Sequence, residues 1–277
     1  MEESAMQVFN RLTMLTVASA IALSLASGAA YAKKGRNNPC QGLPTHAELL
    51  AALAASGATA PAGDPLDNGG FRLHMWGTVV NRDSIVCAVA FTGADRDEQW
   101  PASRVISAAK AYTANSLSLP GLALSTGNLY ASSQPGGSLW GVQFANLTNV
   151  DPPKGAYKGP AKNFGQANDP MVGNRIGGHI VFGGGFALYN SAGEIVGGLG
   201  VSGDTSCKDH NFGWRVRHEL GLDFVPGGVS PDATRPDNII YDMGAASQGL
   251  IVSPSAFGHT DCGLGEAAIS ATLPTVP

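Results

Sequence analysis

One helical stripe carries the residue types best suited to bind a flat ligand. His210, Trp214 and His218 stand four residues apart, which places them along one face of a helix, with Arg215 and Arg217 beside it. Imidazole can ligate iron, indole can stack on a flat ring and guanidinium can pair with carboxylates, so this stripe could receive haem. The alternative is an ordinary amphipathic helix with a core tryptophan and solvated His and Arg side chains. The spacing alone favours this alternative.

A glycine-rich segment, IVGGLGVSGDTSCKDH at 195–210, leads into this helix. From Gly198 to Gly203 it spells G-x-G-x-x-G, the letters of a dinucleotide-binding loop. Asp204 stands where a pyrophosphate would arrive, and no βαβ unit follows. We therefore expect the glycines to let a strand bend or let another backbone approach closely.

The same segment holds residues that could bind a metal or act as a nucleophile. Asp204, Cys207, Asp209 and His210 are potential ligands, but there is no C-x-x-C and no His pair at i, i+4. Ser202 matches half of a nucleophile elbow, yet aspartate replaces the second glycine of G-x-S-x-G. The sequence predicts neither a dedicated structural metal site nor a serine hydrolase.

The remaining histidines differ in their surroundings. His179 lies in the glycine-rich stretch GGHIVFGGG and allows the same two interpretations as the stripe, an iron ligand or a structural residue. His46, His74 and His259 belong to no pattern, and we expect them to be structural or exposed. Covalent c-type haem attachment is excluded because the sequence has no C-x-x-C-H, whereas non-covalent haem remains open.

The first 32 residues predict a secretory signal peptide. Arg11 precedes an apolar run that ends in the small-residue pattern Ala30-Tyr31-Ala32. An uncleaved anchor is the alternative, and either places the rest of the chain in the periplasm or outside the cell. We expect the processed chain to be free of the membrane, since no second long apolar run follows. A net charge of -4 offers no basic surface for nucleic acid.

Four cysteines follow the predicted cleavage site. In an oxidising compartment an even number favours disulfides over free thiols, so we expect two bridges. Three pairings are possible. A Cys207–Cys262 bridge would hold a tail with little regular structure, which leaves Cys40 with Cys87.

Caps, turns and hydrophobic periodicity predict alternating helices and hairpins. The predicted elements are a helix from Thr45 to Gly57, a hairpin over 71–93, a helix over 102–116, a lid or excursion over 151–170, a hairpin turning at 190–193, a helix from Ser206 to Gly221, and short strands at 236–242 and 249–253. This order favours an α+β fold, a central antiparallel sheet with helices packed on it. The expected regions after the signal peptide are an N-terminal helix and linker over 33–70, a main domain over 71–225 and a loop-rich extension over 226–277.

Several motifs together resemble the GlcG/HbpS family, in its exported, long-tailed branch. They are SRVISAAKAYTANSLSLP, LYASSQPGGSLWGV and GGHIVFGGGFALYNSAGEIVGGLGVSGDTSCKDHNFGWRVR. The resemblance covers roughly 71–222 and implies an antiparallel α+β domain, homo-oligomers and non-covalent haem binding. Positions that match the family are Lys110, Thr113, Gly177, Gly178, Gly200, Val201, Ser202, Gly203 and Asp209. His179, the cysteines and the tail after about Pro226 depart from it.

Three functional hypotheses follow, and the first is an exported protein that binds haem b without catalysis. Its candidate ligand-contacting residues are His210, His179, His218, Asp209, Trp214, Arg215, Arg217, Lys110, Thr113 and Ser202. Here His210 is the preferred iron ligand, His179 and His218 are alternates, and the arginines face the propionates. The second is an enzyme or accessory factor for a small hydroxy acid or carboxylate, oriented by Lys110, Arg104 and Asp209. The third is an oligomeric scaffold without an active pocket.

Overall fold

The computed structural model describes residues 38–146, 155–244 and 252–277. The chain divides into two compact units, 1–41 and 42–277, and every helix and strand below belongs to the second unit. The predicted signal peptide lies outside the described residues. Within those ranges, no helix is long and apolar enough to cross a bilayer.

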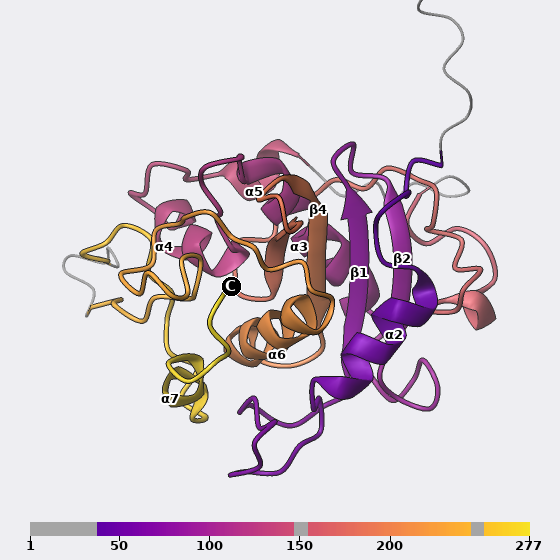
Figure 1. Ribbon diagram of the computed structural model, residues 1–277, viewed down its shortest axis with the longest axis horizontal. Coiled ribbons are helices and arrows are strands. Elements are labelled where there is room, and N and C mark those ends of the chain that lie inside the picture. Colours follow the sequence, from indigo (N-terminus) through magenta and orange to yellow (C-terminus); the bar gives the residue numbers. More distant parts are fainter. Residues whose placement is uncertain (1–37, 147–154, 245–251) are drawn as a thin grey trace, which may run out of the picture. The chain divides into compact units, whose positions relative to one another are not determined.

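A four-stranded antiparallel sheet forms the centre of this unit, as predicted (Figure 1). Its strands, in spatial order, are β2 (Val86–Phe91), β1 (Trp76–Asn81), β4 (Ile195–Ser202) and β3 (Gly185–Tyr189). Each outer pair is a predicted hairpin, and β1 and β4 join the two hairpins. The β3–β4 turn contains Gly193 at φ +72°, a left-handed conformation that costs glycine little.

One face of the sheet is covered by α3 (Ser103–Leu117), which lies directly on β4. A side chain at Gly198 or Gly200 would collide with the α3 backbone at Ala111 and Ser107. The prediction that these glycines admit a second backbone is therefore confirmed. Close approach at β4 brings the middle of α3 within side-chain reach of the turn after the strand.

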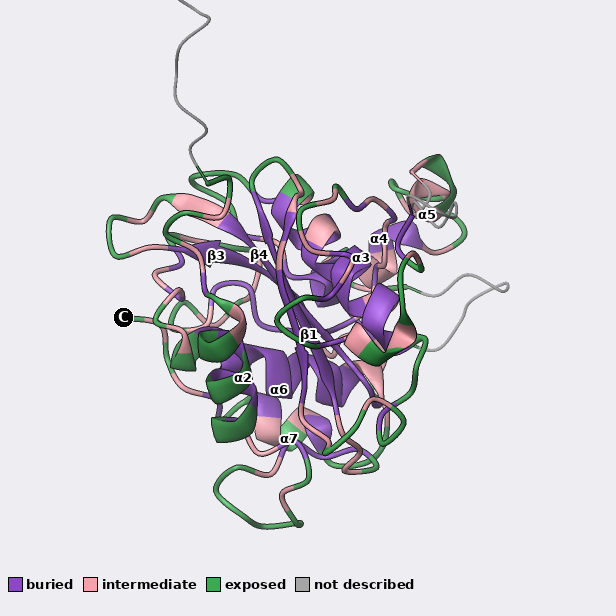
Figure 2. Ribbon diagram, turned by 90° about the vertical axis from the view of Figure 1, so that its right-hand side faces the viewer, coloured by how far each residue is buried: buried purple, intermediate pink, exposed green. Residues whose placement is uncertain are grey.

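The other face is covered by α2 (His46–Ala55) and α6 (Ser206–Glu219). Leu199 and Val201 of β4 share one buried cluster with Leu53 of α2 and Phe212 of α6. Burying such a side chain contributes about 1.5–3 kcal/mol. The result is three layers, with buried strands between α3 and the α2–α6 pair (Figure 2).

The N-terminal caps of α2 and α6 were both predicted from the sequence as single residues. Thr45 caps α2, where it forms the reciprocal capping box with Glu48. For α6 the predicted cap, Ser206, is wrong. Thr205 has the extended backbone of a cap, and its side chain accepts the Lys208 N–H, so Ser206 is the first residue inside the helix.

Short helical turns connect these elements. They are η2 (Thr126–Leu129), α4 (Tyr130–Ser133), α5 (Val142–Ala145), η3 (Ala161–Asn163) and α7 (Glu266–Ser270). The described part of the predicted excursion, 155–170, packs on the start of α3, where the buried Asp169 pairs with Arg104.

The strand predicted at 236–242 is wrong. Its backbone groups are bonded by side chains and by loop backbone rather than by a neighbouring strand: the Asn238 carbonyl accepts from the Asn128 side chain, and the Ile240 carbonyl accepts the His259 N–H. The apolar residues of this segment are buried against the rest of the protein, and a short buried strand would have the same apolar pattern. The strand predicted at 249–253 falls largely outside the described residues.

Candidate functional site

The structure divides the predicted stripe on α6 into a buried part and an exposed end. His210 and Trp214 are buried with ring centroids 6.1 Å apart. His218 is 42 % exposed at the side chain, and its Nδ1 lies 2.7 Å from Asp223. The spacing therefore predicts the shared face of His210 and Trp214, but not what covers it.

His210, the preferred iron ligand from the sequence, is fully enclosed. Its Nε2 lies 3.0 Å from Asn238 Oδ1 and 3.1 Å from the Ile239 nitrogen, while Gly127 packs against the Nδ1 side. Burial lowers the pKa of His210 to about 3, so the ring is neutral. In this structure neither nitrogen opens to a pocket, and Nδ1 is buried without a hydrogen-bond partner among the described residues. The cause is the segment after Pro226, which covers this face of α6.

The other ligand candidates on α6 are also committed to the fold. Trp214 Nε1 donates to the Pro274 carbonyl at 2.9 Å. Arg217 makes a two-pronged ion pair with the buried Asp237, at 2.6 and 2.8 Å. Arg215 Nε donates to Asn68 at 3.1 Å. These guanidinium groups therefore have protein partners where the sequence suggested ligand carboxylates.

Lys110 and Asp209 meet across the layers rather than in a cavity. Lys110 Nζ reaches from α3 to Asp209 Oδ2 at 2.6 Å, and both side chains are buried. Asp209 also accepts the N–H groups of Gly203 and Asp204, at 3.2 and 3.0 Å. Burial raises the pKa of Asp209 to about 6 and lowers that of Lys110. With Arg104 paired to Asp169, the cations assigned to a small carboxylate substrate are all occupied.

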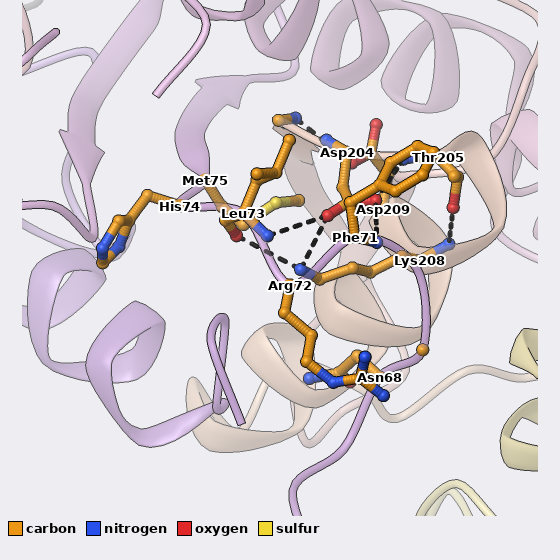
Figure 3. Close-up of polar contacts among 12 residues, drawn as sticks. Asn68, Phe71, Arg72, Leu73, His74, Met75, Asp204, Thr205, Lys208 and Asp209 are labelled. Carbon is orange, nitrogen blue, oxygen red and sulfur yellow. Dashed lines mark hydrogen bonds and ion pairs between the residues drawn. The ribbon is translucent and has the colours of Figure 1, made fainter. Parts of the chain in front are cut away.

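The turn after β4 is filled by protein groups where a pyrophosphate would need to sit. Asp204 accepts the N–H groups of Phe71 and Leu73, each at 2.9 Å, and pairs with Lys208 at 2.9 Å (Figure 3). The preceding Ser202 is buried at the end of β4, opposite Trp76. This turn therefore connects the segment before β1 to α6. Its role is structural, in agreement with its departure from the dinucleotide-binding pattern.

A pocket of about 260 Å³ contains His179, one of the histidines that the sequence offered as an iron ligand. Its lining comes from α4, α5 and the segment before β3, namely Tyr130, Gln134, Gln143, Asn146, Gly178, His179, Ile180, Val181 and Phe182. A larger groove of about 660 Å³ lies along α2 and the end of α6, but its charged lining residues are Glu48 and Glu219. The smaller pocket is the one that contains an imidazole.

His179 is held in this pocket by one ring nitrogen. Its Nδ1 lies 3.2 Å from the Val142 carbonyl, and its ring lies beside that of Tyr112, with centroids 5.4 Å apart. A carbonyl can only accept, so Nδ1 carries the proton and Nε2 keeps its lone pair. Burial lowers the pKa of His179, which favours the neutral ring. Fixing one nitrogen on a carbonyl is how proteins prepare the other for a metal.

Thr113 positions the segment that carries His179. Its hydroxyl accepts the Ile180 N–H at 3.0 Å and lies 3.2 Å from the Gly178 carbonyl. Gly178 has φ +93°, a conformation that L side chains rarely adopt. Two positions of the family pattern, Thr113 and Gly178, therefore flank the histidine that departs from it.

Gln143 contributes an unsatisfied group to the same pocket. Its Oε1 is buried without a hydrogen-bond partner among the described residues. A buried acceptor without a donor costs free energy, so a bound molecule or water that donates to it would be stabilised. No group of three or more His, Cys, Asp or Glu able to hold a metal ion occurs in the described ranges.

Sequence reasoning gave no role to His259, which the structure places near this pocket. It is buried and its ring packs on Tyr130, with centroids 4.8 Å apart. The only signal in the sequence was its position three residues before Cys262. The structure joins Cys262 to Cys207 by a disulfide, and Cys40 and Cys87 are disulfide-bonded as well.

Comparisons with known proteins agree with the resemblance drawn from the motifs. Residues 78–215, from β1 into α6, match the family described as haem degrading protein HbpS-like. No curated protein matches the chain.

Three solved structures are similar to the chain. The PduOC:heme complex is 17% identical, covering 62% of this chain and 89% of its own, with a TM-score of 0.40. Klebsiella pneumoniae protein ORFY is 20% identical, covering 68% and 97%, with a TM-score of 0.41. HbpS is 15% identical, covering 69% and 99%, with a TM-score of 0.36. Through residues 78–215, this chain belongs to the HbpS-like family.

Proposed function

We propose that this protein is an exported haem-binding protein and that His179 provides the iron ligand. The observation that carries the proposal is the state of His179: Nδ1 donates to the Val142 carbonyl, which leaves the lone pair on Nε2, and the residue lines a pocket. Histidine Nε2 is a common axial ligand of haem iron. The HbpS-like family match over 78–215 supports the same ligand class.

The pocket walls suit part of a haem. Tyr130 and Phe182 offer aromatic rings against which a flat ring can stack. Ligand pockets usually measure about 300–1,000 Å³. At about 260 Å³, this pocket would enclose one edge of a haem and leave the rest at the surface. None of the lining residues is cationic, so ligand carboxylates would have no basic partner here.

The proposed ligand is haem b, bound without a covalent link to the protein. Cysteine attachment is excluded because the sequence has no C-x-x-C-H and all four cysteines are disulfide-bonded. When bound, haem supplies an iron centre that accepts axial ligands. The protein's part is to keep His179 neutral and oriented, through Val142 on one side and Thr113 on the other.

Export belongs to the proposal and rests on the signal-peptide pattern together with the disulfides. Disulfides persist in oxidising compartments such as the periplasm and the extracellular space. Cys207–Cys262 joins the first turn of α6 to the C-terminal residues. Homo-oligomerisation, implied by the family resemblance, stays a prediction.

A haem titration tests the proposal. Purified protein is titrated with ferric haem while the Soret band is recorded, and we expect a saturable shift that His179→Ala weakens about tenfold or more in affinity. His218→Ala is the matched control, because it removes an exposed imidazole outside the pocket. The absence of a saturable shift in the wild type would overturn the function. An unchanged spectrum and affinity in His179→Ala would overturn the ligand assignment.

A further inference from the structure

The C-terminal tail, residues 252–277, contacts segments that line the proposed haem pocket. The disulfide joins Cys262 in the tail to Cys207 in the first turn of α6. Just before Cys262 in the chain, Gly258 and His259 contact two of the three segments that line the pocket. The tail, with Cys262, lies outside the residues matched to the family, whereas Cys207 lies within them.

The first of these contacts is with α4. Tyr130, a lining residue, packs its ring against that of His259 at a centroid distance of 4.8 Å. The next residue, Ala131, donates its N–H to the Gly258 carbonyl at 2.9 Å. The start of α4 is therefore attached to the tail by one ring contact and one backbone hydrogen bond.

The second contact is with the segment before β3. Gly183 directs its N–H toward His259 Nε2, with a separation of 3.4 Å. The residues just before it, Val181 and Phe182, line the pocket. His259 Nδ1 lies 2.7 Å from the Thr260 carbonyl, so Nδ1 carries the proton and Nε2 is the acceptor for Gly183.

His259 thus stands between two walls of one pocket. It is 1 % exposed, and Cys207 Sγ lies 3.9 Å from its Nδ1. The bridge ends only three residues away, at Cys262, so the disulfide limits how far His259 can move from Tyr130 and Gly183. Side chains buried in this way transmit small displacements to their neighbours.

We propose that His259, held in place by the Cys207–Cys262 disulfide, is the positioning residue that sets the pocket's walls, and that reduction of this disulfide loosens the pocket and speeds ligand release. The predicted effect on ligand release rests on the proposed haem function, whereas the predicted effect on the pocket walls is independent of it.

The redox step requires a dithiol reductant. Its thiolate attacks the partly exposed Cys262 sulfur, the S–S bond breaks, and Cys207 leaves as a thiolate that takes up a proton. The second thiolate of the reductant then attacks the mixed disulfide, closes its own disulfide and releases Cys262 as a thiol. Two electrons pass from the dithiol to the protein.

Reduction should loosen the tail locally rather than detach it. Farther along the tail, Trp214 still bonds the Pro274 carbonyl, and Asn211 bonds the Glu266 carbonyl at 3.0 Å. Leu273 remains in a buried cluster with Phe186 and Trp214. The variant Cys207→Ser/Cys262→Ser is therefore expected to fold.

Amide hydrogen exchange tests the walls without any ligand. In Cys207→Ser/Cys262→Ser, we expect the Ala131 and Gly183 amides to exchange about tenfold faster than in the wild type, relative to the Val79 amide in the central strand. Leu273→Ala is the matched control, because it removes packing of the tail at a position distant in sequence from His259. It should leave the exchange rates of Ala131 and Gly183, each relative to Val79, unchanged. Unchanged ratios in the double variant would overturn the proposal.

Haem dissociation tests the consequence for the ligand. We expect the release rate to rise about tenfold in Cys207→Ser/Cys262→Ser and in His259→Ala, the size of effect that one or two lost buried contacts produce. His259→Phe keeps a ring against Tyr130 but removes the acceptor for Gly183, so its rate should fall between those of His259→Ala and the wild type. Leu273→Ala should release haem at the wild-type rate.

The two measurements separate the two hypotheses. A wild type that binds haem, with equal release rates in all variants, overturns the role of His259 and leaves the proposed function intact. A wild type that binds no haem overturns the proposed function, and the exchange ratios at Ala131 and Gly183 then decide alone whether the disulfide holds the walls.

Discussion

Two histidine-containing regions of this protein have similar residue types and opposite surroundings. On α6, His210 lies beside Trp214 under the segment after Pro226, and its Nε2 lies within hydrogen-bond distance of Asn238 Oδ1 and the Ile239 nitrogen. Before β3, His179 lies beside Tyr112 in an open pocket, with one nitrogen bonded. The α6 region therefore contains the residue types of a haem site, but its His and Trp side chains are packed in the protein interior.

The difference teaches that residue type indicates a possible chemistry, whereas the partners of the remaining polar atoms determine whether a ligand can use it. Around α6 most polar groups have partners in distant segments, such as Asp237 for Arg217 and Pro274 for Trp214, although His210 Nδ1 has none among the described residues. What separates the two histidines is access, since His210 is fully buried and His179 lines a pocket. Four substitutions or conditions test this contrast through the free energy of unfolding.

The largest expected effect is at Arg217. Arg217→Met leaves Asp237 as an unpaired buried carboxylate, which should lower the free energy of unfolding by about 3–5 kcal/mol. Urea unfolding monitored by circular dichroism measures it. Arg217→Met/Asp237→Leu removes both charges and should recover most of the loss. A single variant within about 1 kcal/mol of the wild type would contradict the assignment of this face to the core.

The next effect is a pH dependence from His259. Burial lowers its pKa from 6.5 to about 4, so between these values the unfolded chain binds a proton that the folded protein does not. Stability should therefore be complete above pH 6.5 and should fall by about 3 kcal/mol as the pH drops to about 4. Urea unfolding at pH 7 and at about pH 4 measures the loss.

The control for this pH dependence is His259→Phe, in which the contribution should vanish. Asp209 acts in the opposite sense, since burial raises its pKa to about 6 and its charged form is disfavoured in the folded state. It is present in both proteins, so the difference between them isolates His259. Parallel pH profiles for wild type and variant would show that folding does not lower the pKa of His259.

A smaller effect is expected at Thr113, which positions the pocket residue. Thr113→Val removes the acceptor for the Ile180 N–H and should cost about 1–2 kcal/mol, measured by urea unfolding. It should also weaken haem binding, because the segment carrying His179 loses its attachment. Thr113→Ser keeps the hydroxyl and should retain both stability and binding. Equal behaviour of the two variants would remove Thr113 from the site.

The smallest effect on stability is expected at His179. His179→Ala loses one hydrogen bond at a partly buried position and should change the free energy of unfolding by less than about 1 kcal/mol. Its effect on the haem titration should nevertheless exceed that of Thr113→Val. A loss of stability as large as that of Arg217→Met would show that His179 is a core residue.

Much of the fold follows from local patterns that the chain contains. Thr45 and Glu48 indicate the start of α2, and Gly193 indicates the turn of the second hairpin. The glycines of β4 predict close contact with another backbone. Such signals act within a few residues, so they can be read without knowing the rest of the molecule. The wrong cap of α6 shows their limit, because Thr205 and Ser206 are both capable caps.

The candidate site was less predictable, and the reason is distance along the chain. Lys110 finds its partner 99 residues away, and His259 meets Gly183 76 residues away. The strand predicted at 236–242 failed because a short apolar run is equally able to cover a helix. No periodicity distinguishes His210 from His179 as ligands.

From the residues alone come the antiparallel α+β layout, the family resemblance and the set of side chains able to bind haem. Folding then assigns each of those side chains to the core or to a pocket. The assignment depends on which distant segment satisfies each buried polar group, as Pro274 does for Trp214. Bonds between neighbours in sequence build helices and hairpins, whereas accessibility depends on contacts between neighbours in space.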